Sequence, residues 1–209
     1  MSKDIVVLDY GLGNVRSVSN ALRLIGATAS VTRDLAHIER CDGLVIPGVG
    51  AFPQAMQNLH ETGLIEAVRG YMRSGRPVLG ICLGMQILCD EGTEFQRTPG
   101  LGFIPGCVER IPIAPSEGRL PHIAWSVIEA KSAAQAMFVG LTPEQLRFYF
   151  VHSFAATRVP PEFVAATVNY LGHEIVAAVG RDNVCGTQFH PEKSGAAGLQ
   201  VLKNFTSRC

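Results

Sequence analysis

The chain has 209 residues, of which 47% are hydrophobic and only 17% are charged. A chain of this length and hydrophobicity can bury a sizeable core, which excludes extensive disorder and suits a single domain. Its 18 basic and 18 acidic side chains give a formal charge of zero, which argues against a nucleic-acid-binding protein because such proteins normally carry a basic excess.

The cysteines and the N-terminus indicate a reducing compartment. No C-x-x-C pair occurs, so the sequence predicts neither a zinc module nor the disulfide framework of a small secreted domain. The apolar stretch 5–8 is too short for a signal peptide, and no stretch approaches the roughly 18 apolar residues of a membrane span. We therefore expect a cytoplasmic protein that contacts no membrane. The cysteines are Cys41, Cys82, Cys89, Cys107, Cys185 and Cys209.

The first half of the chain alternates short apolar runs with helical patterns. Asn14 suits the N-cap of the first helix, and Gly26 suits its C-terminal stop. This β-α-β order predicts a parallel sheet with helices on both faces, whose ligands bind at the carboxyl ends of the strands. The predicted strands are 5–8, 29–32, 43–46 and 78–81, and the predicted helices are 15–25, 53–61, 64–74 and 83–88.

After about residue 100 short strands follow one another, which predicts an antiparallel part that extends the same sheet. The fold class is therefore α/β, with an open mixed, mostly parallel sheet flanked by helices and an antiparallel C-terminal part, in one domain over residues 1–209. The predicted elements are strands at 107–111, 148–154, 163–170, 174–179 and 184–189, a turn at 181–183 and a closing helix at 198–205.

A G-x-C-x-G pattern marks the end of the fourth predicted strand. Gly80 and Gly84 flank Cys82 where that strand passes into a helix, which is the pattern of a nucleophile elbow with cysteine in place of serine. The N-terminus of the helix would favour a thiolate there. The alternative is a cysteine that only packs in the core, as we expect for the other five.

A catalytic cysteine needs a base, and His190 is the best placed of the six histidines. It ends the strand 184–189 and is followed by Pro191 and Glu192. Residues i and i+2 of an extended segment point the same way, so Glu192 can hold the imidazole as the aspartate does in a serine triad. A His-x-Glu pair could also bind a metal, but no third ligand lies nearby in the sequence, and we expect no metal.

Two glycine-containing loops follow the other strands. The segment 47–50 holds two glycines around Val49 and could aim backbone N–H groups at an oxyanion, although an ordinary turn would have the same pattern. The segment 11–16 begins like a dinucleotide-binding loop, but Arg16 stands at the third glycine position, and no P-loop pattern occurs. We therefore expect no bound cofactor.

In combination these motifs resemble the class I (triad) glutamine amidotransferases. The resemblance rests on the segment 79–86 around Cys82 and on 188–192 around His190. Five further segments, 9–14, 47–52, 121–125, 149–153 and 190–194, resemble the glutaminase subunits of imidazole glycerol phosphate synthases. The resemblance covers nearly the whole chain and implies a flavodoxin-like fold.

The family resemblance implies roles for ten residues. Cys82 would attack the side-chain amide of glutamine and form a thioester, His190 would move protons, and Glu192 would orient His190. The remaining residues would form the oxyanion hole, through the backbone of Val49 and Leu83, and the glutamine site, through Gly50, Gln86, Glu94, His152 and Ser153.

The resemblance also implies a partner. Ammonia would pass to a cyclase subunit with a (β/α)₈ barrel in a heterodimer, because free ammonia would otherwise protonate in water. The family usually carries His-x-Gly-Trp-Asn where this chain has the segment from His122 to Ser126, with Ala124 in place of glycine. We expect this segment to face the partner. The departure leaves open a paralogous glutaminase that serves another synthase, such as a sugar amidotransferase.

Two other readings of the same residues remain. A γ-glutamyl cysteine hydrolase would share the elbow and the His-x-Glu pair but act without a partner. A non-catalytic regulatory subunit would not need the intact residues Cys82, His190 and Glu192. Glutamine hydrolysis with and without a cyclase subunit separates these readings.

Overall fold

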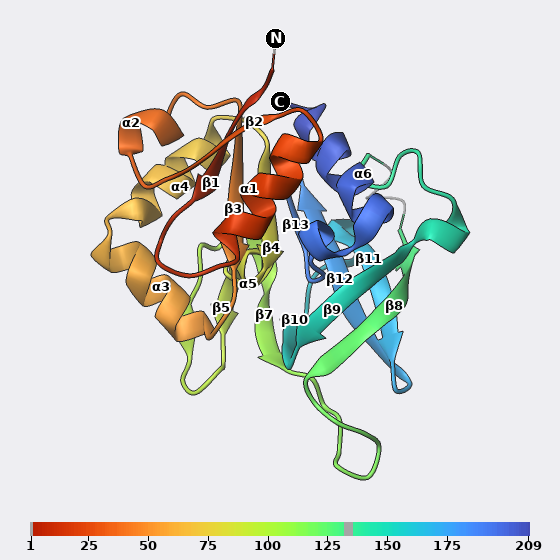
Figure 1. Cartoon of the computed structure of the whole chain (residues 1–209). Coiled ribbons are helices and arrows are strands. Elements are labelled where there is room, and N and C mark those ends of the chain that lie inside the picture. Colours follow the sequence, from red (N-terminus) through yellow and green to blue (C-terminus); the bar gives the residue numbers. More distant parts are fainter. Residues whose placement is uncertain (1, 132–135) are drawn as a thin grey trace.

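The computed structural model describes residues 2–131 and 136–209. Within them, nine strands form one sheet in the order β2-β1-β3-β4-β13-β12-β11-β8-β9 (Figure 1). Pairing is parallel from β2 to β13 and antiparallel from β13 to β9. In sheet order the strands are Thr28–Thr32, Asp4–Leu8, Gly43–Gly48, Val78–Cys82, Val184–Thr187, His173–Arg181, Val164–Tyr170, His122–Ala130 and Arg147–His152.

Helices cover both faces of the parallel part of this sheet. Ile5 and Val7 of β1 share a buried cluster with α1 and α6, whereas Val6 and Leu8 share another with α2, α3 and α4 (Figure 1). Side chains of a strand alternate between its two faces, so a continuous apolar run is what a sheet covered on both sides requires. The helices are α1 Val15–Leu24, α2 Leu35–Ile38, α3 Phe52–Glu61, α4 Leu64–Arg73, α5 Leu83–Gln86 and α6 Gly195–Thr206.

The predicted fold class is confirmed, but a second sheet was not foreseen. It has the order β10-β7-β5-β6, so the strand expected at 107–111 belongs to this second sheet and does not extend the main one. The predicted strand 148–154 is divided at Ser153, whose carbonyl accepts a hydrogen bond from Ile111 N at 2.9 Å. The chain changes its pairing partner there from β8 to β7. The strands are Phe154–Thr157, Ile104–Arg110, Cys89–Gly92 and Thr98–Pro99.

The helix expected at 83–88 is also shorter than predicted. It ends after one turn because the loop after β6 binds the carbonyls that would continue it. Leu101 N donates to Ile87 O at 2.8 Å and Phe103 N donates to Leu88 O at 2.9 Å. Short 3₁₀ turns at Pro143–Gln145, Pro161–Phe163 and Pro191–Lys193 complete the fold. No helix in the described part of the chain is long and apolar enough to span a membrane.

Candidate active site

The candidate site lies at the carboxyl ends of three central strands. Strand β4 ends at Cys82, which pairs with Gly48 at the end of β3. On its other side, Ile81 pairs with Thr187 at the end of β13. The loop 47–50 and the segment that leads to His190 therefore flank Cys82, as expected for a ligand site in a parallel α/β sheet.

Cys82 stands in a sharp strand-to-helix turn with the backbone angles φ 55° and ψ −110°. Non-glycine residues rarely adopt a positive φ, and such strain concentrates at functional sites. A Cβ atom on Gly80 would lie 2.6 Å from Gly84 O, and one on Gly84 would lie 1.7 Å from Ile46 O. The predicted elbow is thus present, and both glycines are required by close backbone contacts.

The expectation that a helix dipole favours a thiolate at Cys82 is weakened by the structure. Helix α5, which begins at Leu83, has four residues, and a single turn aligns few peptide dipoles. The dipole of α5 therefore contributes less to a negative charge on the sulfur than that of a longer helix would.

His190 and Glu192 form a buried pair. His190 Nδ1 lies 2.8 Å from Glu192 Oε1, with 2% and 0% of the two side chains exposed. Asn14 Nδ2 also donates to Oε1, at 3.4 Å. The prediction that Glu192 faces His190 is confirmed, but the backbone is not extended throughout, because Pro191 starts a 3₁₀ turn that carries Glu192 back toward the imidazole.

The surroundings of His190 favour its protonated form. Burial alone would lower the pKa of His190, but its interactions with Cys82 and Glu192 outweigh burial and raise it to about 9. His190 Nε2 has no hydrogen-bond partner among the described residues. The arrangement thus favours an imidazolium beside a sulfur atom.

A cavity of about 530 Å³ opens over Cys82. Nine of the ten predicted site residues line it, and Glu192 lies behind His190. The cavity also contains residues that the sequence did not single out. The predicted residues are Val49, Gly50, Cys82, Leu83, Gln86, Glu94, His152, Ser153 and His190, and the additional ones are Phe95, Arg110, Pro121, Val151 and Phe154.

The polar side chains of this cavity are held by the backbone around them. Glu94 Oε2 accepts a hydrogen bond from Phe52 N, at the start of α3, at 2.8 Å. Gln86 Nε2 donates to Phe154 O at 2.9 Å and to Gln188 Oε1 at 3.0 Å. Both amide hydrogens of Gln86 are therefore used within the protein, and its oxygen can accept a hydrogen bond from a ligand.

Gln188 is a further residue of this region for which the sequence motifs predicted no role. Its Nε2 atom lies 3.6 Å from Cys82 Sγ, and the side chain is fully buried. Strand β13 ends at Thr187 and the chain bends at Gln188 and Phe189, so no local sequence pattern places this side chain beside Cys82.

Two histidines continue the polar network from the cavity to strand β8. His152 Nδ1 lies 2.9 Å from Phe154 O, and His152 Nε2 lies 3.1 Å from His122 Nδ1. His122 Nε2 lies 2.9 Å from Ser126 Oγ. A carbonyl oxygen can only accept a hydrogen bond, so His152 Nδ1 carries the hydrogen. His152 Nε2 then accepts from His122 Nδ1, and His122 Nε2 accepts from Ser126 Oγ. Burial lowers the pKa of both histidines to about 4, and they are neutral.

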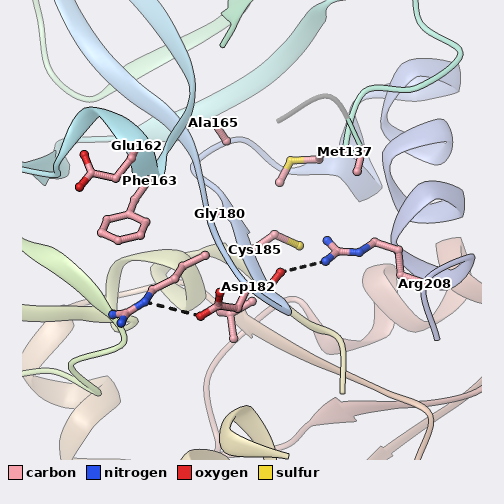
Figure 2. A pocket seen from close by; sticks show the side chains of 11 residues that line it. Met137, Glu162, Phe163, Ala165, Gly180, Asp182, Cys185 and Arg208 are labelled. Atoms are coloured by element: carbon pink, nitrogen blue, oxygen red, sulfur yellow. Dashed lines mark hydrogen bonds and ion pairs between the residues drawn. The ribbon is translucent and has the colours of Figure 1, made fainter. Parts of the chain in front are cut away.

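Another cavity, of about 430 Å³, lies beside the turn between β12 and β13, with Arg208 at its rim (Figure 2). Arg181 pairs with Asp182 at its edge, and Arg208 donates to Asp182 O at 3.0 Å. Its thiol, Cys185, donates to Val78 O, and burial raises its pKa to about 11, which makes it a poor nucleophile at neutral pH. Elsewhere too, the described residues include no group of three or more side chains placed to hold a metal ion.

Comparison with known proteins agrees with this geometry. The family model "Glutamine amidotransferase class-I" matches residues 6–209. A protein of Symbiobacterium thermophilum, named imidazole glycerol phosphate synthase subunit HisH, is 48% identical over 202 residues, which are 96% of this chain and 92% of that protein. The protein with the same name from Syntrophotalea carbinolica is 45% identical over 96% of this chain and 98% of its own length.

Solved structures show the same fold at low sequence identity. PurLQS from Thermotoga maritima superposes with a TM-score of 0.76 at 19% identity, covering 99% of both chains. A putative GMP synthase chain from Thermoplasma acidophilum gives a TM-score of 0.72 at 20% identity, covering 100% of this chain and 94% of that one.

Proposed function

This chain belongs to the glutamine amidotransferase class-I family, and on that basis we propose that the cavity over Cys82 hydrolyses glutamine to glutamate and ammonia. Its function is that of the glutaminase subunit of imidazole glycerol phosphate synthase, in histidine biosynthesis. The observation that carries the chemistry is the buried His190–Glu192 pair, 2.8 Å apart, next to the Cys82 elbow.

The proposed reaction begins with Cys82 as thiolate and His190 as imidazolium. The sulfur attacks the side-chain carbonyl carbon of glutamine, and a C–S bond forms. The C–N bond then breaks while His190 gives its proton to the leaving nitrogen, which departs as ammonia. His190 next takes a proton from water, the resulting hydroxide attacks the thioester, and the C–S bond breaks to release glutamate. Glu192 holds the imidazole and stabilises its charged form throughout.

The oxyanion formed in each step would be held by the backbone N–H groups of Val49 and Leu83. Both residues line the cavity beside Cys82. Leu83 is the first residue of α5, and the first N–H groups of a helix have no acceptor within it. Gly50 has φ 109°, a value that glycine adopts without strain, so the loop 47–50 can turn sharply over the sulfur.

The remaining cavity residues would hold the substrate. Glu94 offers a carboxylate to the α-ammonium group of glutamine, and Gln86 offers its free amide oxygen. The backbone around His152 and Ser153 would bind the other end of the substrate, with Gly50 covering it. All five line the same cavity as Cys82.

The chain works as one subunit of a complex, and its proposed partner is a cyclase with a (β/α)₈ barrel that receives the ammonia in a heterodimer. Alternate residues of β8 support a docking surface next to the cavity. Ile123, Trp125 and Val127 are 58%, 49% and 54% exposed, and exposed apolar clusters of this kind mark interaction sites. Ser126, where the family usually has asparagine, turns inward to His122, so the departure leaves this apolar face intact.

The six cysteines are all free thiols, and five of them are buried. This supports a reducing compartment, and we place the reaction in the cytoplasm. The family match over residues 6–209 supports one catalytic domain.

A Cys82→Ala variant tests the proposal. In the complex with the cyclase it should lose imidazole glycerol phosphate synthesis from glutamine and keep synthesis from added ammonium salts. Loss of both activities would mean that Cys82 holds the fold or the interface together. Glutamine hydrolysis by the wild-type chain alone, at the rate of the complex, would instead favour a partner-independent γ-glutamyl hydrolase.

A further inference from the structure

We propose that Gln188 stabilises the thiolate of Cys82 through a permanent N–H···S hydrogen bond, and that Gln86 fixes the amide in the required orientation. This inference rests on the proposed function, since it assigns a residue to the same reaction. The contact itself is Gln188 Nε2 to Cys82 Sγ at 3.6 Å.

The orientation of the Gln188 amide follows from its neighbours. Phe154 O can only accept a hydrogen bond, so the atom of Gln86 that faces it at 2.9 Å must be the amide nitrogen. The same nitrogen lies 3.0 Å from the Gln188 side chain, which must present its oxygen there. The amide nitrogen of Gln188 is therefore the atom directed at the sulfur. The Phe154 carbonyl thus determines which group reaches Cys82.

The backbone of Gln188 adds rigidity to this arrangement. Its N–H donates to Ala177 O at 2.9 Å, which prolongs the pairing of β13 with β12. The side chain is fully buried, so water does not compete for the amide. Because both its side chain and its backbone are hydrogen-bonded, the Gln188 amide can stabilise negative charge on the sulfur without changing its own position during the reaction.

Burial disfavours the thiolate form of other cysteines in this chain. The pKa of Cys89 is raised to about 12 and that of Cys185 to about 11, in both cases mainly by burial. Cys82 is only 7% exposed, and the single turn of α5 provides little dipole. His190 can stabilise the thiolate only while it is protonated. An amide N–H has no such dependence on pH, so Gln188 donates to the sulfur whatever the protonation state of His190.

The test is a pair of substitutions read by the pH dependence of thiol alkylation. Gln188→Met keeps the length of the side chain but has no N–H donor. Gln188→Glu still accepts from Gln86 but places a carboxylate against the sulfur. For each full-length chain, the rate of Cys82 modification by iodoacetamide is measured by peptide mapping between pH 5 and pH 10. Gln57→Met, on the exposed face of α3, is the matched control.

We expect the midpoint of the alkylation profile to move up by about one pH unit in Gln188→Met, with about ten-fold slower modification at neutral pH. The shift should be larger in Gln188→Glu and absent in Gln57→Met. In the complex, glutamine hydrolysis by Gln188→Met should recover as the pH rises, since alkalinity restores the thiolate.

An unmoved midpoint in both Gln188 variants would overturn the inference. So would a loss of hydrolysis that is uniform across pH, because Gln188 would then only support the structure. These results differ from failure of the proposed function, which would appear as an absence of glutamine hydrolysis by the wild-type complex.

Discussion

Replacing Glu192 with glutamine removes the charge of the candidate triad with little change in shape. Glu192 Oε1 accepts from His190 and Asn14, so the amide oxygen of the introduced glutamine would take that position. Its amide nitrogen would occupy the place of Oε2, an atom without a hydrogen-bond partner in the described residues. The variant therefore isolates the effect of the negative charge on the imidazolium.

The size of the effect follows from the burial of the pair. Nδ1 and Oε1 are 2.8 Å apart and essentially inaccessible to solvent, so salt and water screen them little. A buried hydrogen bond to a charged group contributes roughly 1.5–3 kcal/mol, or about one to two pKa units. The pKa of His190, about 9 in the wild type, should fall to roughly 7–8 in Glu192→Gln.

The same shift changes how stability depends on pH. The pKa of His190 is raised above its ordinary value of 6.5, so the native state holds this proton more tightly than the unfolded chain. The resulting stabilisation, up to about 3 kcal/mol, is complete below pH 6.5 and is lost as the pH rises through about 9. In Glu192→Gln it should be smaller, and its loss should be complete at a lower pH.

Nuclear magnetic resonance with isotope-labelled histidine measures this titration directly in the full-length chain. His190→Asn identifies the resonance, and Glu66→Gln, which removes an exposed carboxylate paired with Arg69, is the control. The His190 resonance should titrate one to two units lower in Glu192→Gln and be unchanged in Glu66→Gln. An unchanged titration in Glu192→Gln would refute the electrostatic role of Glu192.

Further predictions concern stability. Gly84→Ala should destabilise the fold by about 3 kcal/mol or more in denaturant unfolding, because its Cβ would lie 1.7 Å from Ile46 O. Gly70→Ala, in open space on α4, should instead stabilise by up to about 1 kcal/mol, and equal effects would contradict the close-contact argument. The lowered pKa values of His122 and His152, about 4, predict that stability is complete above pH 6.5 and falls as the pH drops toward 4, because only the unfolded chain takes up the protons. His122→Phe, which keeps an aromatic ring, should make that fall shallower, and an identical pH dependence in the variant would show that His122 does not titrate as described.

The parallel half of the fold was predictable because local signals and tertiary structure agree there. The run Ile5-Val6-Val7-Leu8 divides between two cores in the alternating way that a strand covered on both faces requires. The G-x-C-x-G pattern predicted the Cys82 elbow for a steric reason that the structure reproduces.

The second sheet depends on contacts that no local pattern contains. Its strands are as short as two residues, and the change of pairing partner at Ser153 is set by a hydrogen bond to Ile111, far away in the sequence. The length of α5 is likewise decided by the loop at 101–103. In each case a backbone group that is distant in the sequence forms the hydrogen bond that would otherwise continue the strand or helix. The periodicity of hydrophobic residues in one sequence does not predict such long-range hydrogen bonds.

The candidate site likewise contains some residues that could be predicted from the sequence and others that could not. Cys82, His190 and Glu192 were identifiable because their chemistry requires particular residue types at particular spacings. The contact of Gln188 with Cys82 and the chain from Ser126 through its neighbouring histidines were not. Amide and hydroxyl side chains occur throughout any protein, and only the three-dimensional structure distinguishes those that face reacting atoms.

The proposed chemistry requires that Cys82 form a covalent bond to the glutamyl group of its substrate. Acid quenching of the complex during turnover, followed by peptide mass mapping, detects that bond directly. We predict one glutamyl group on the peptide that contains Cys82 and none in the Cys82→Ala variant. A glutamyl group on another residue, or continued glutamine hydrolysis by Cys82→Ala, would contradict the mechanism.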